Sequence, residues 1–292
     1  IKKDYILEDP ELLCCVFGEC KKCCDEICYD DNSKYPVIFL HGHDFNKDVS
    51  AEYSIGAFSR MQKKLEDDGY INAGSILVNN RDEKLKGILG KNSEPVSLKA
   101  SYYFDLFRSS ENEIIIQTKE DNIDSYALRL NDIIEEVKYK TNRKKVNLVT
   151  HSMGGLVARK YMQIFGAEDI NKLVFIAAPN KGVSGDILDI CDIFGAKLEC
   201  RDLDEKSLFL NKLNSVSLPD VKIYNVVGVG CDTDGEDGDG VVKSSSAFLD
   251  GAENIFVNGD CTRLKLKFLH TELVDPDKYP EVYRIINNSL KP

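Results

Sequence analysis

The sequence lacks an excess of basic residues, a long apolar run, an internal repeat and any low-complexity tract. Its formal net charge is -11 and its pI is near 5.0, so it provides no basic surface for nucleic acid or for anionic lipid head groups. The longest apolar stretches, such as 36–40 and 173–178, have the length of a strand, whereas a membrane-spanning helix needs roughly 18 apolar residues. We therefore expect no nucleic-acid partner and no stable membrane span.

Cysteine, in contrast, is abundant. The chain has ten cysteines, and six of them lie between residues 14 and 28. An even number suits disulfides in an oxidising compartment, which predicts an extracellular or cell-surface protein. One alternative is a metal or iron–sulfur site, because Cys20 and Cys23 have ligand-like spacing, although no second pair of this kind and no nearby histidine completes a zinc set. The other alternative is reduced thiols without a special role.

Short apolar, β-branched runs alternate with amphipathic stretches after residue 33. This alternation is typical of an α/β fold in which a mostly parallel sheet is flanked by helices. The polar, weakly periodic stretch 81–110 is predicted to be a loop. We predict a cysteine-rich N-terminal extension over 1–32 and one large domain over 33–292, with strands at 35–40, 75–78, 113–118, 146–150, 173–178, 221–229 and 254–257 and helices at 55–68, 122–140, 153–165 and 280–290.

The segment 182–219 interrupts this alternation between two predicted strands. It is expected to be a small helical insertion, because five residues of its first half share one face of a short helix: Ile187, Ile190, Cys191, Phe194 and Leu198. Two interpretations remain open. The apolar face packs on the sheet as part of the core, or it faces a binding site as a lid.

The segment 146–159 carries the strongest chemical signal in the chain. A predicted strand runs directly into a predicted helix, with Ser152 at the junction and Gly154 and Gly155 just after it. Such a tight turn presents a serine side chain at the edge of a sheet. Because the serine stands at a helix N-terminus, backbone N–H groups, including that of Met153, point to the place where an oxyanion would form.

The sequence Thr-His-Ser152-Met-Gly-Gly resembles the nucleophile elbow of microbial lipases and esterases of the α/β-hydrolase family. That family usually has glycine or alanine where Thr150 stands. Two weaker similarities, at 177–182 and 207–214, extend the resemblance over about residues 35–290. It implies an α/β-hydrolase fold with a small helical lid insertion over 182–219.

A serine nucleophile needs a histidine to accept its proton and an acid to orient that histidine. In this family the chain order is serine, acid, histidine. Only four histidines exist, and His270 is the only one after Ser152. Gly238-Asp239-Gly-Val-Val resembles the lipase segment that carries the catalytic aspartate, so the resemblance implies Asp239, with Asp237 as the second choice.

Further site residues are implied by the loop after the strand 35–40. His41-Gly42 resembles the oxyanion loop of lipases, in which the residue after the glycine supplies a backbone N–H. This assigns the oxyanion hole to the N–H groups of His43 and Met153. Because His41 and His43 are two residues apart, a pair of metal ligands is the alternative, but a structural role in a loop that adjoins a strand is favoured.

The acidic, glycine-rich stretch 231–239 permits two interpretations. Asp232, Asp234 and Asp237 are candidate calcium ligands, because calcium prefers oxygen ligands on such loops. However, Asp237 stands where the glycine of an EF-hand loop is expected when counting from Asp232. A solvated acidic loop is therefore favoured, and we expect neither a metal nor another cofactor.

Together these features predict a serine hydrolase that cleaves carboxylic esters, either small molecules or lipids, through an acyl-enzyme intermediate. Ile190 and Phe194 of the lid are expected to contact the acyl chain. The alternatives are a thioesterase, amidase or peptidase with the same residues, or a binding protein without activity, which normally requires loss of a triad residue. We also predict the disulfides Cys191–Cys200 and Cys231–Cys261. No oligomeric state is indicated.

Overall fold

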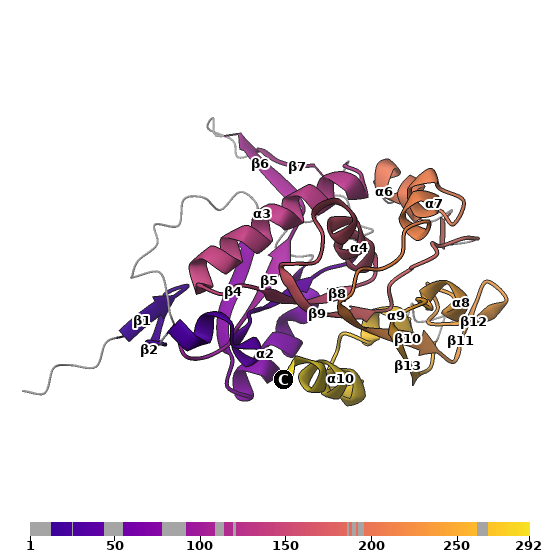
Figure 1. Cartoon of the computed structure of the whole chain (residues 1–292). Coiled ribbons are helices and arrows are strands. Elements are labelled where there is room, and N and C mark those ends of the chain that lie inside the picture. The colour runs from indigo at the N-terminus through magenta and orange to yellow at the C-terminus, as the bar shows by residue number, and fades with distance from the viewer. Residues whose placement is uncertain are drawn as a thin grey trace, which may run out of the picture.

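The computed structural model describes residues 13–24, 26–43, 55–77, 92–108, 114–118, 121–185, 187–188, 191, 196–261 and 268–292. Its centre is a seven-stranded sheet in the order β13-β10-β9-β8-β3-β5-β4. Every neighbouring pair in this sheet is parallel. Helices cover both faces, with α3 and α4 on one side and α2 and α10 on the other (Figure 1). The predicted α/β-hydrolase fold is thereby confirmed in its architecture.

The strands of the large sheet are β3 (Val37–Leu40), β4 (Ile71–Leu77), β5 (Val96–Ser101), β8 (Val146–His151), β9 (Ile170–Ile176), β10 (Lys222–Val229) and β13 (Glu253–Asn258). Within the described residues, three two-stranded sheets accompany it, formed by β1 (Leu13–Val16) with β2 (Glu19–Lys22), β6 (Phe104–Arg108) with β7 (Ile114–Thr118), and β11 (Cys231–Thr233) with β12 (Glu236–Gly238). The α-helices are α2 (Ser59–Asp67), α3 (Ile123–Thr141), α4 (Met153–Phe165), α6 (Lys197–Leu203), α7 (Leu208–Asn214), α8 (Ser244–Ala247), α9 (Leu269–Glu272) and α10 (Pro280–Leu290). The 3-10 turns are η1 (Glu26–Tyr29), η2 (Asn32–Lys34) and η3 (Ile55–Phe58).

The alternation of side chains along the strands produces two cores, one on each face of the sheet. Ile38 and Leu40 of β3 belong to the cluster with α3 and α4. Val37 and Phe39 of the same strand belong to the cluster with α2 and α10. Since both faces are covered, β3 is apolar at every position, as parallel strands usually are.

Strand β5 corrects the prediction that 81–110 is a loop. Its residues Ser97 and Ser101 are fully buried, and such polar residues weakened the apolar pattern by which a strand is recognised. Their hydroxyl groups have partners inside the fold, since Ser97 Oγ donates to the carbonyl of Ile71 at 3.3 Å and Ser101 Oγ lies 2.9 Å from His41 Nε2. Buried polar groups are tolerated when they are paired in this way.

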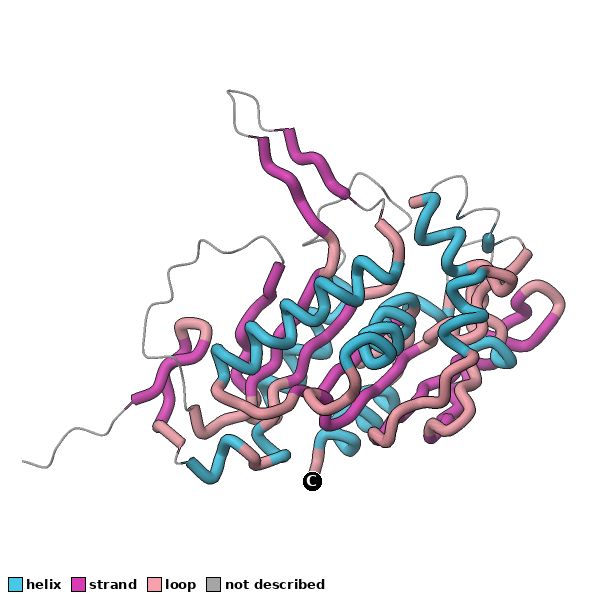
Figure 2. The backbone as a smooth tube through the Cα atoms, turned by 45° about the horizontal axis from the view of Figure 1, so that its top comes forward, coloured by secondary structure: helices cyan, strands magenta, loops and turns pink. Residues whose placement is uncertain are grey.

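The hairpin β6–β7 is a second difference from the prediction. The predicted strand 113–118 exists as β7, but it pairs antiparallel with β6 and does not join the large sheet. The hairpin projects away from the rest of the molecule in both views (Figures 1 and 2). β6 also lies in the stretch that was predicted to be a loop.

The cysteine-rich segment folds as the hairpin β1–β2 with three disulfides, Cys14–Cys23, Cys15–Cys20 and Cys24–Cys28. Cys20 and Cys23 are therefore disulfide-bonded, which favours the disulfide interpretation over the metal one. Val16 is buried in the core on the α3 and α4 face, and the N–H of Ser93 donates to the carbonyl of Lys22 at 3.1 Å. The division into 1–32 and 33–292 stays a proposal.

The segment 182–219, predicted to be an insertion, lies between β9 and β10 and contains α6 and α7. Arg159 of α4 links this segment to the residues just before it, because Nη2 donates to Oδ1 of Asn214 at 2.7 Å and Nη1 to the carbonyl of Asn180 at 3.0 Å. Burial lowers the pKa of Arg159 to about 10. No helix within the described ranges is both long and apolar enough to cross a membrane.

Candidate functional site

Ser152 stands at the sharp turn between the central strand β8 and helix α4. Its φ is +52°, a backbone conformation that costs energy for a residue other than glycine. The turn is held by two backbone hydrogen bonds, from the N–H of Ser152 to the carbonyl of Ile176 and from the N–H of Gly155 to the carbonyl of Ser152, each 2.9 Å long. Strain of this kind is what a nucleophile elbow requires to present its side chain.

Glycines surround the turn because other segments of backbone approach it closely. A Cβ atom at Gly42 would lie 2.7 Å from Ser152 Cβ, and one at Gly154 would lie 2.5 Å from the carbonyl oxygen of His41. A Cβ atom at Gly155 would lie 2.6 Å from the Cβ of Ala178. The loop after β3 and the start of α4 are thus in direct contact beside Ser152.

The structure brings Ser152, His270 and Asp239 together. His270 Nε2 lies 3.0 Å from Ser152 Oγ, and His270 Nδ1 lies 2.8 Å from Asp239 Oδ2. A carboxylate can only accept, so Nδ1 carries the proton and Nε2 is left to accept the proton of the serine hydroxyl. The other oxygen of Asp239 accepts the N–H groups of Val241 at 2.9 Å and Val242 at 2.7 Å. All three side chains are buried.

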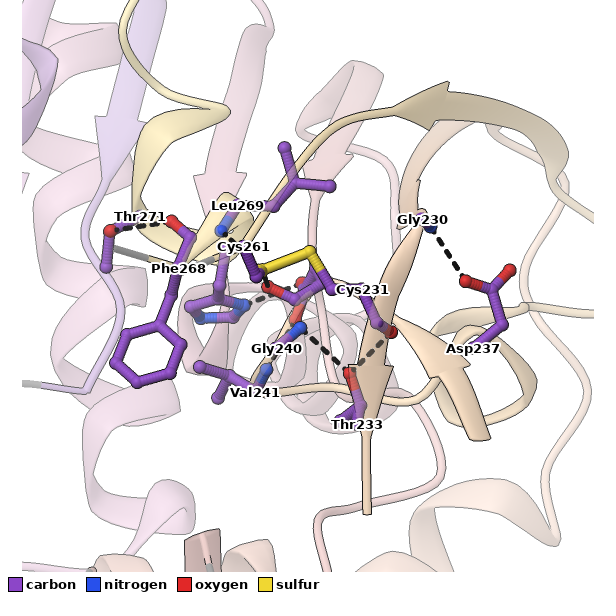
Figure 3. The surroundings of a disulfide bond; sticks show 12 residues. Gly230, Cys231, Thr233, Asp237, Gly240, Val241, Cys261, Phe268, Leu269 and Thr271 are labelled. Atoms are coloured by element: carbon purple, nitrogen blue, oxygen red, sulfur yellow. Dashed lines mark hydrogen bonds and ion pairs between the residues drawn. A yellow bond between two sulfur atoms is a disulfide. The ribbon is translucent and has the colours of Figure 1, made fainter. Parts of the chain in front are cut away.

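The second-choice acid, Asp237, does not contact His270. Its Oδ1 accepts the N–H of Gly230 at 2.7 Å at the base of the β11–β12 hairpin (Figure 3). The other calcium candidates also have partners, since Asp232 Oδ1 accepts the N–H of Gly235 at 3.0 Å and Asp234 Oδ2 lies 3.3 Å from Lys243 Nζ. This hairpin separates β10 from Asp239.

The predicted disulfide Cys231–Cys261 is present and joins the Asp239 loop to the His270 loop (Figure 3). Cys261 Sγ accepts the N–H of Leu269 at 3.3 Å, directly before His270. A Cβ atom at Gly240 would lie 2.9 Å from the same sulfur. The second predicted disulfide, Cys191–Cys200, is present as well.

His151 is a site residue that the sequence reasoning missed. Its Nε2 donates to the backbone carbonyl of His270 at 2.9 Å, and the N–H of His270 donates to the carbonyl of Asp239 at 3.0 Å. Burial, followed by the proximity of His270, lowers the pKa of His151 to about 3. His151 therefore stays neutral and supports the backbone of His270. In the sequence, only the position of His151 directly before Ser152 indicates that it belongs to the site.

The loop that carries the predicted oxyanion donor is held by β5 and the residues after it. Tyr102 OH donates to the carbonyl of His41 at 2.8 Å, and the two rings are stacked with centroids 4.2 Å apart. His41 is thus a structural residue of the loop. Gly42 lies against Ser152, and His43 directly follows Gly42 in the chain. Met153 is the first residue of α4, where a helix leaves its N–H groups without intrahelical partners.

One group of possible metal ligands occurs within the described part of the chain. His43, Cys191 and Cys200 have ligand atoms within 4.8 Å of one another. The two sulfurs form a disulfide, and zinc binding requires thiolates, so this group fits no metal in its present state. The two predicted lid residues, Ile190 and Phe194, lie outside the described residues.

The comparison with protein families agrees with this geometry. The model of the family described as "Alpha/beta hydrolase of unknown function (DUF915)" matches residues 109–258, just over half of the chain. The chain therefore belongs to this family of α/β hydrolases. No curated protein matches the sequence.

Two solved structures of similar fold cover most of the chain. The mature form of lipase BlEst2 from Bacillus licheniformis has 15% identity and a TM-score of 0.53, with 87% of this chain and 94% of that chain covered. The product of gene lin2722 from Listeria innocua has 18% identity and the same TM-score and coverage of both chains. At such identities the likeness concerns the fold.

We predict that the variant Cys231→Ala/Cys261→Ala is less stable than the wild type. The disulfide spans a sequence separation of 30 residues, and loop closure of that size contributes about 3 to 4 kcal/mol. Unfolding in urea measures the loss. The control is Cys191→Ala/Cys200→Ala, whose separation of 9 residues predicts a smaller loss. Equal stability of the wild type and the Cys231/Cys261 variant would contradict the proposed tie between the two loops.

We also predict that His151 makes folding sensitive to acid. The unfolded chain protonates His151 near pH 6.5, whereas the native protein keeps it neutral down to about pH 3, so the free energy of unfolding falls as the pH decreases between these values. His151→Gln retains an N–H donor and cannot titrate. From pH 7 to pH 4.5 it should lose about 2 to 3 kcal/mol less than the wild type. If urea unfolding shows that the free energies of unfolding of the wild type and His151→Gln fall equally with decreasing pH, His151 is not held neutral.

Proposed function

We propose that this protein is a serine hydrolase that cleaves carboxylic esters through Ser152, His270 and Asp239. The observation that carries the proposal is the hydrogen-bonded chain from Ser152 Oγ through His270 to Asp239, with links of 3.0 and 2.8 Å. Its starting point is a serine held at positive φ, directly before a helix. The membership of an α/β-hydrolase family supports the same class of chemistry.

In the first step Ser152 Oγ attacks the carbonyl carbon of the ester while its proton passes to His270 Nε2. The carbonyl oxygen becomes an oxyanion, which we assign to the backbone N–H groups of Met153 and His43. Asp239 stabilises the imidazolium that forms. When the tetrahedral intermediate collapses, the bond to the leaving alcohol breaks, the alcohol takes the proton from Nε2, and the acyl group stays on Ser152.

In the second step water takes the place of the alcohol. His270 Nε2 accepts a proton from the water as its oxygen attacks the acyl carbon. Collapse of the second tetrahedral intermediate releases the carboxylic acid and returns the proton to Ser152. We propose that no metal takes part, since Asp232, Asp234 and Asp237 have partners in the hairpin described above.

The compartment and the substrate class are proposals as well. All ten cysteines form disulfides, which supports an extracellular or cell-surface location because such bonds persist in oxidising environments. The acidic net charge of -11 argues against anionic polymers and favours neutral small-molecule or lipid esters as substrates.

We predict that the pure protein hydrolyses p-nitrophenyl esters and that Ser152→Ala loses the activity by about 10⁴-fold or more, because removing a nucleophile leaves only the weak catalysis of the remaining site. A fluorophosphonate should label Ser152 covalently in the wild type and should not label the Ser152→Ala variant. The control Ser245→Ala changes an exposed serine and should keep full activity.

The same assay tests the competing functions. An ester series of graded acyl length is compared with thioester, amide and peptide substrates, and all rates are repeated after dialysis against a chelator. Turnover of amides or thioesters above that of all esters would replace the ester assignment. Loss of activity that calcium restores would overturn the metal-free mechanism, and Ser152→Ala activity within about tenfold of the wild type would reject Ser152 as nucleophile.

We predict that Asp239→Asn lowers kcat far more than Asp237→Asn does. Only Asp239 contacts His270 Nδ1, and an asparagine there no longer selects the required tautomer, which costs about 10⁴-fold in kcat in sites of this kind. Asp237 accepts the N–H of Gly230 instead, so its amide variant should retain activity within a few-fold of the wild type. The opposite order of kcat values would assign the acid to Asp237.

A further inference from the structure

Glu199 is a carboxylate with no solvent exposure on helix α6 of the insertion. Removing a charge from water is costly unless the charge finds partners. Its Oε1 accepts the hydroxyl of Tyr126, and its Oε2 pairs with His43 Nδ1 and accepts the hydroxyl of Tyr103 at 3.4 Å. Glu199 contacts neither Ser152, His270 nor Asp239, so the proposed triad does not explain why this carboxylate is buried.

The partners of Glu199 come from three different parts of the hydrolase fold. Tyr126 belongs to α3, Tyr103 follows β5, and His43 belongs to the loop after β3. Burial, followed by the charge of Glu199, raises the pKa of Tyr126 far above its usual range. The tyrosine hydroxyl therefore stays protonated and remains a donor to Glu199. The carboxylate of Glu199 thus joins helix α6 to three other parts of the fold.

The opposite edge of the His43 ring also meets the insertion. His43 Nε2 lies 3.7 Å from Cys191 Sγ, and Cys191 is joined to Cys200, the residue directly after Glu199. The side chain of His43 is 5% exposed. Both ring nitrogens therefore contact the insertion, while the backbone of the same residue follows Gly42, which lies against Ser152.

We propose that Glu199 is a positioning residue that holds the His43 ring, and through it the backbone N–H of His43, in place beside Ser152. The inference rests on the proposed function, in which that N–H is an oxyanion donor. A preorganised donor stabilises the transition state and contributes little to binding of the ground state. The insertion then acts on the chemistry itself, in addition to any contact with substrate.

The test compares Glu199→Gln with Asp202→Asn. Asp202 lies on the same helix and is 4% exposed. It accepts the N–H of Ile123 at 3.1 Å and pairs with Arg201, so it controls for a general loosening of α6. On a short-chain p-nitrophenyl ester, Glu199→Gln should lower kcat about tenfold or more with little change in KM, since complete loss of one oxyanion donor costs about 10² to 10³-fold. Asp202→Asn should leave both parameters within about twofold.

A second readout does not depend on activity. Hydrogen-exchange mass spectrometry of the peptide that contains residues 37–43 should show faster exchange in Glu199→Gln than in the wild type and in Asp202→Asn. In a double-mutant cycle, His43→Gln combined with Glu199→Gln should lose no more kcat than the stronger single variant, because the two side chains act as one unit.

The outcomes separate this inference from the function on which it rests. Unchanged exchange in Glu199→Gln, or equal losses in Glu199→Gln and Asp202→Asn, would overturn the positioning role even if the wild type cleaves esters. A change in the KM of Glu199→Gln with an unchanged kcat would also overturn it. Faster exchange in a protein whose wild type cleaves no ester would reject the ester function and retain the role of Glu199 in holding the loop.

Discussion

The position of His270 is the constraint on which the rest of the candidate site depends. Four of the hydrogen bonds described above meet at this residue: its ring accepts from Ser152 and donates to the Asp239 carboxylate, and its backbone donates to the carbonyl of Asp239 and accepts from His151. A side chain so held has little conformational freedom left to lose during a reaction, which is how a preorganised site differs from the same groups in solution. The end of β8, the disulfide at Cys261 and the short helix α9 all help to fix the position of His270.

Much of the fold and of the site could be predicted because their signals are short-range. The turn at Ser152 needs a strand, a serine, two glycines and a helix within about ten residues, and each leaves a local pattern. His270 was identified by scarcity, since no other histidine follows Ser152. Asp239 required a family resemblance, because the acidic stretch around it offers several carboxylates, and only the folded hairpin separates the one at His270 from Asp237.

The features that escaped prediction depend on contacts between distant segments. β5 has a weak apolar pattern because Ser97 and Ser101 are buried with partners that the local sequence does not reveal. Glu199 looks like an exposed helix residue until His43, 156 positions earlier in the chain, and Tyr126, 73 positions earlier, are placed beside it. His151 lies in the segment that resembles the elbow, but nothing in that segment shows that its ring contacts His270. In each case a polar group is buried only because its partner is present.

The glycines around Ser152, His270 and Asp239 limit where this candidate site can vary. A Cβ atom added at Gly42, Gly154 or Gly228 would lie only 2.5 to 2.7 Å from a backbone or Cβ atom of another residue. At Gly228 that atom is the Cβ of Asp239. No side chain larger than hydrogen fits on these sides without moving the atoms that face them. Changes of substrate preference, whether by natural divergence or by engineering, are therefore expected at positions other than these glycines.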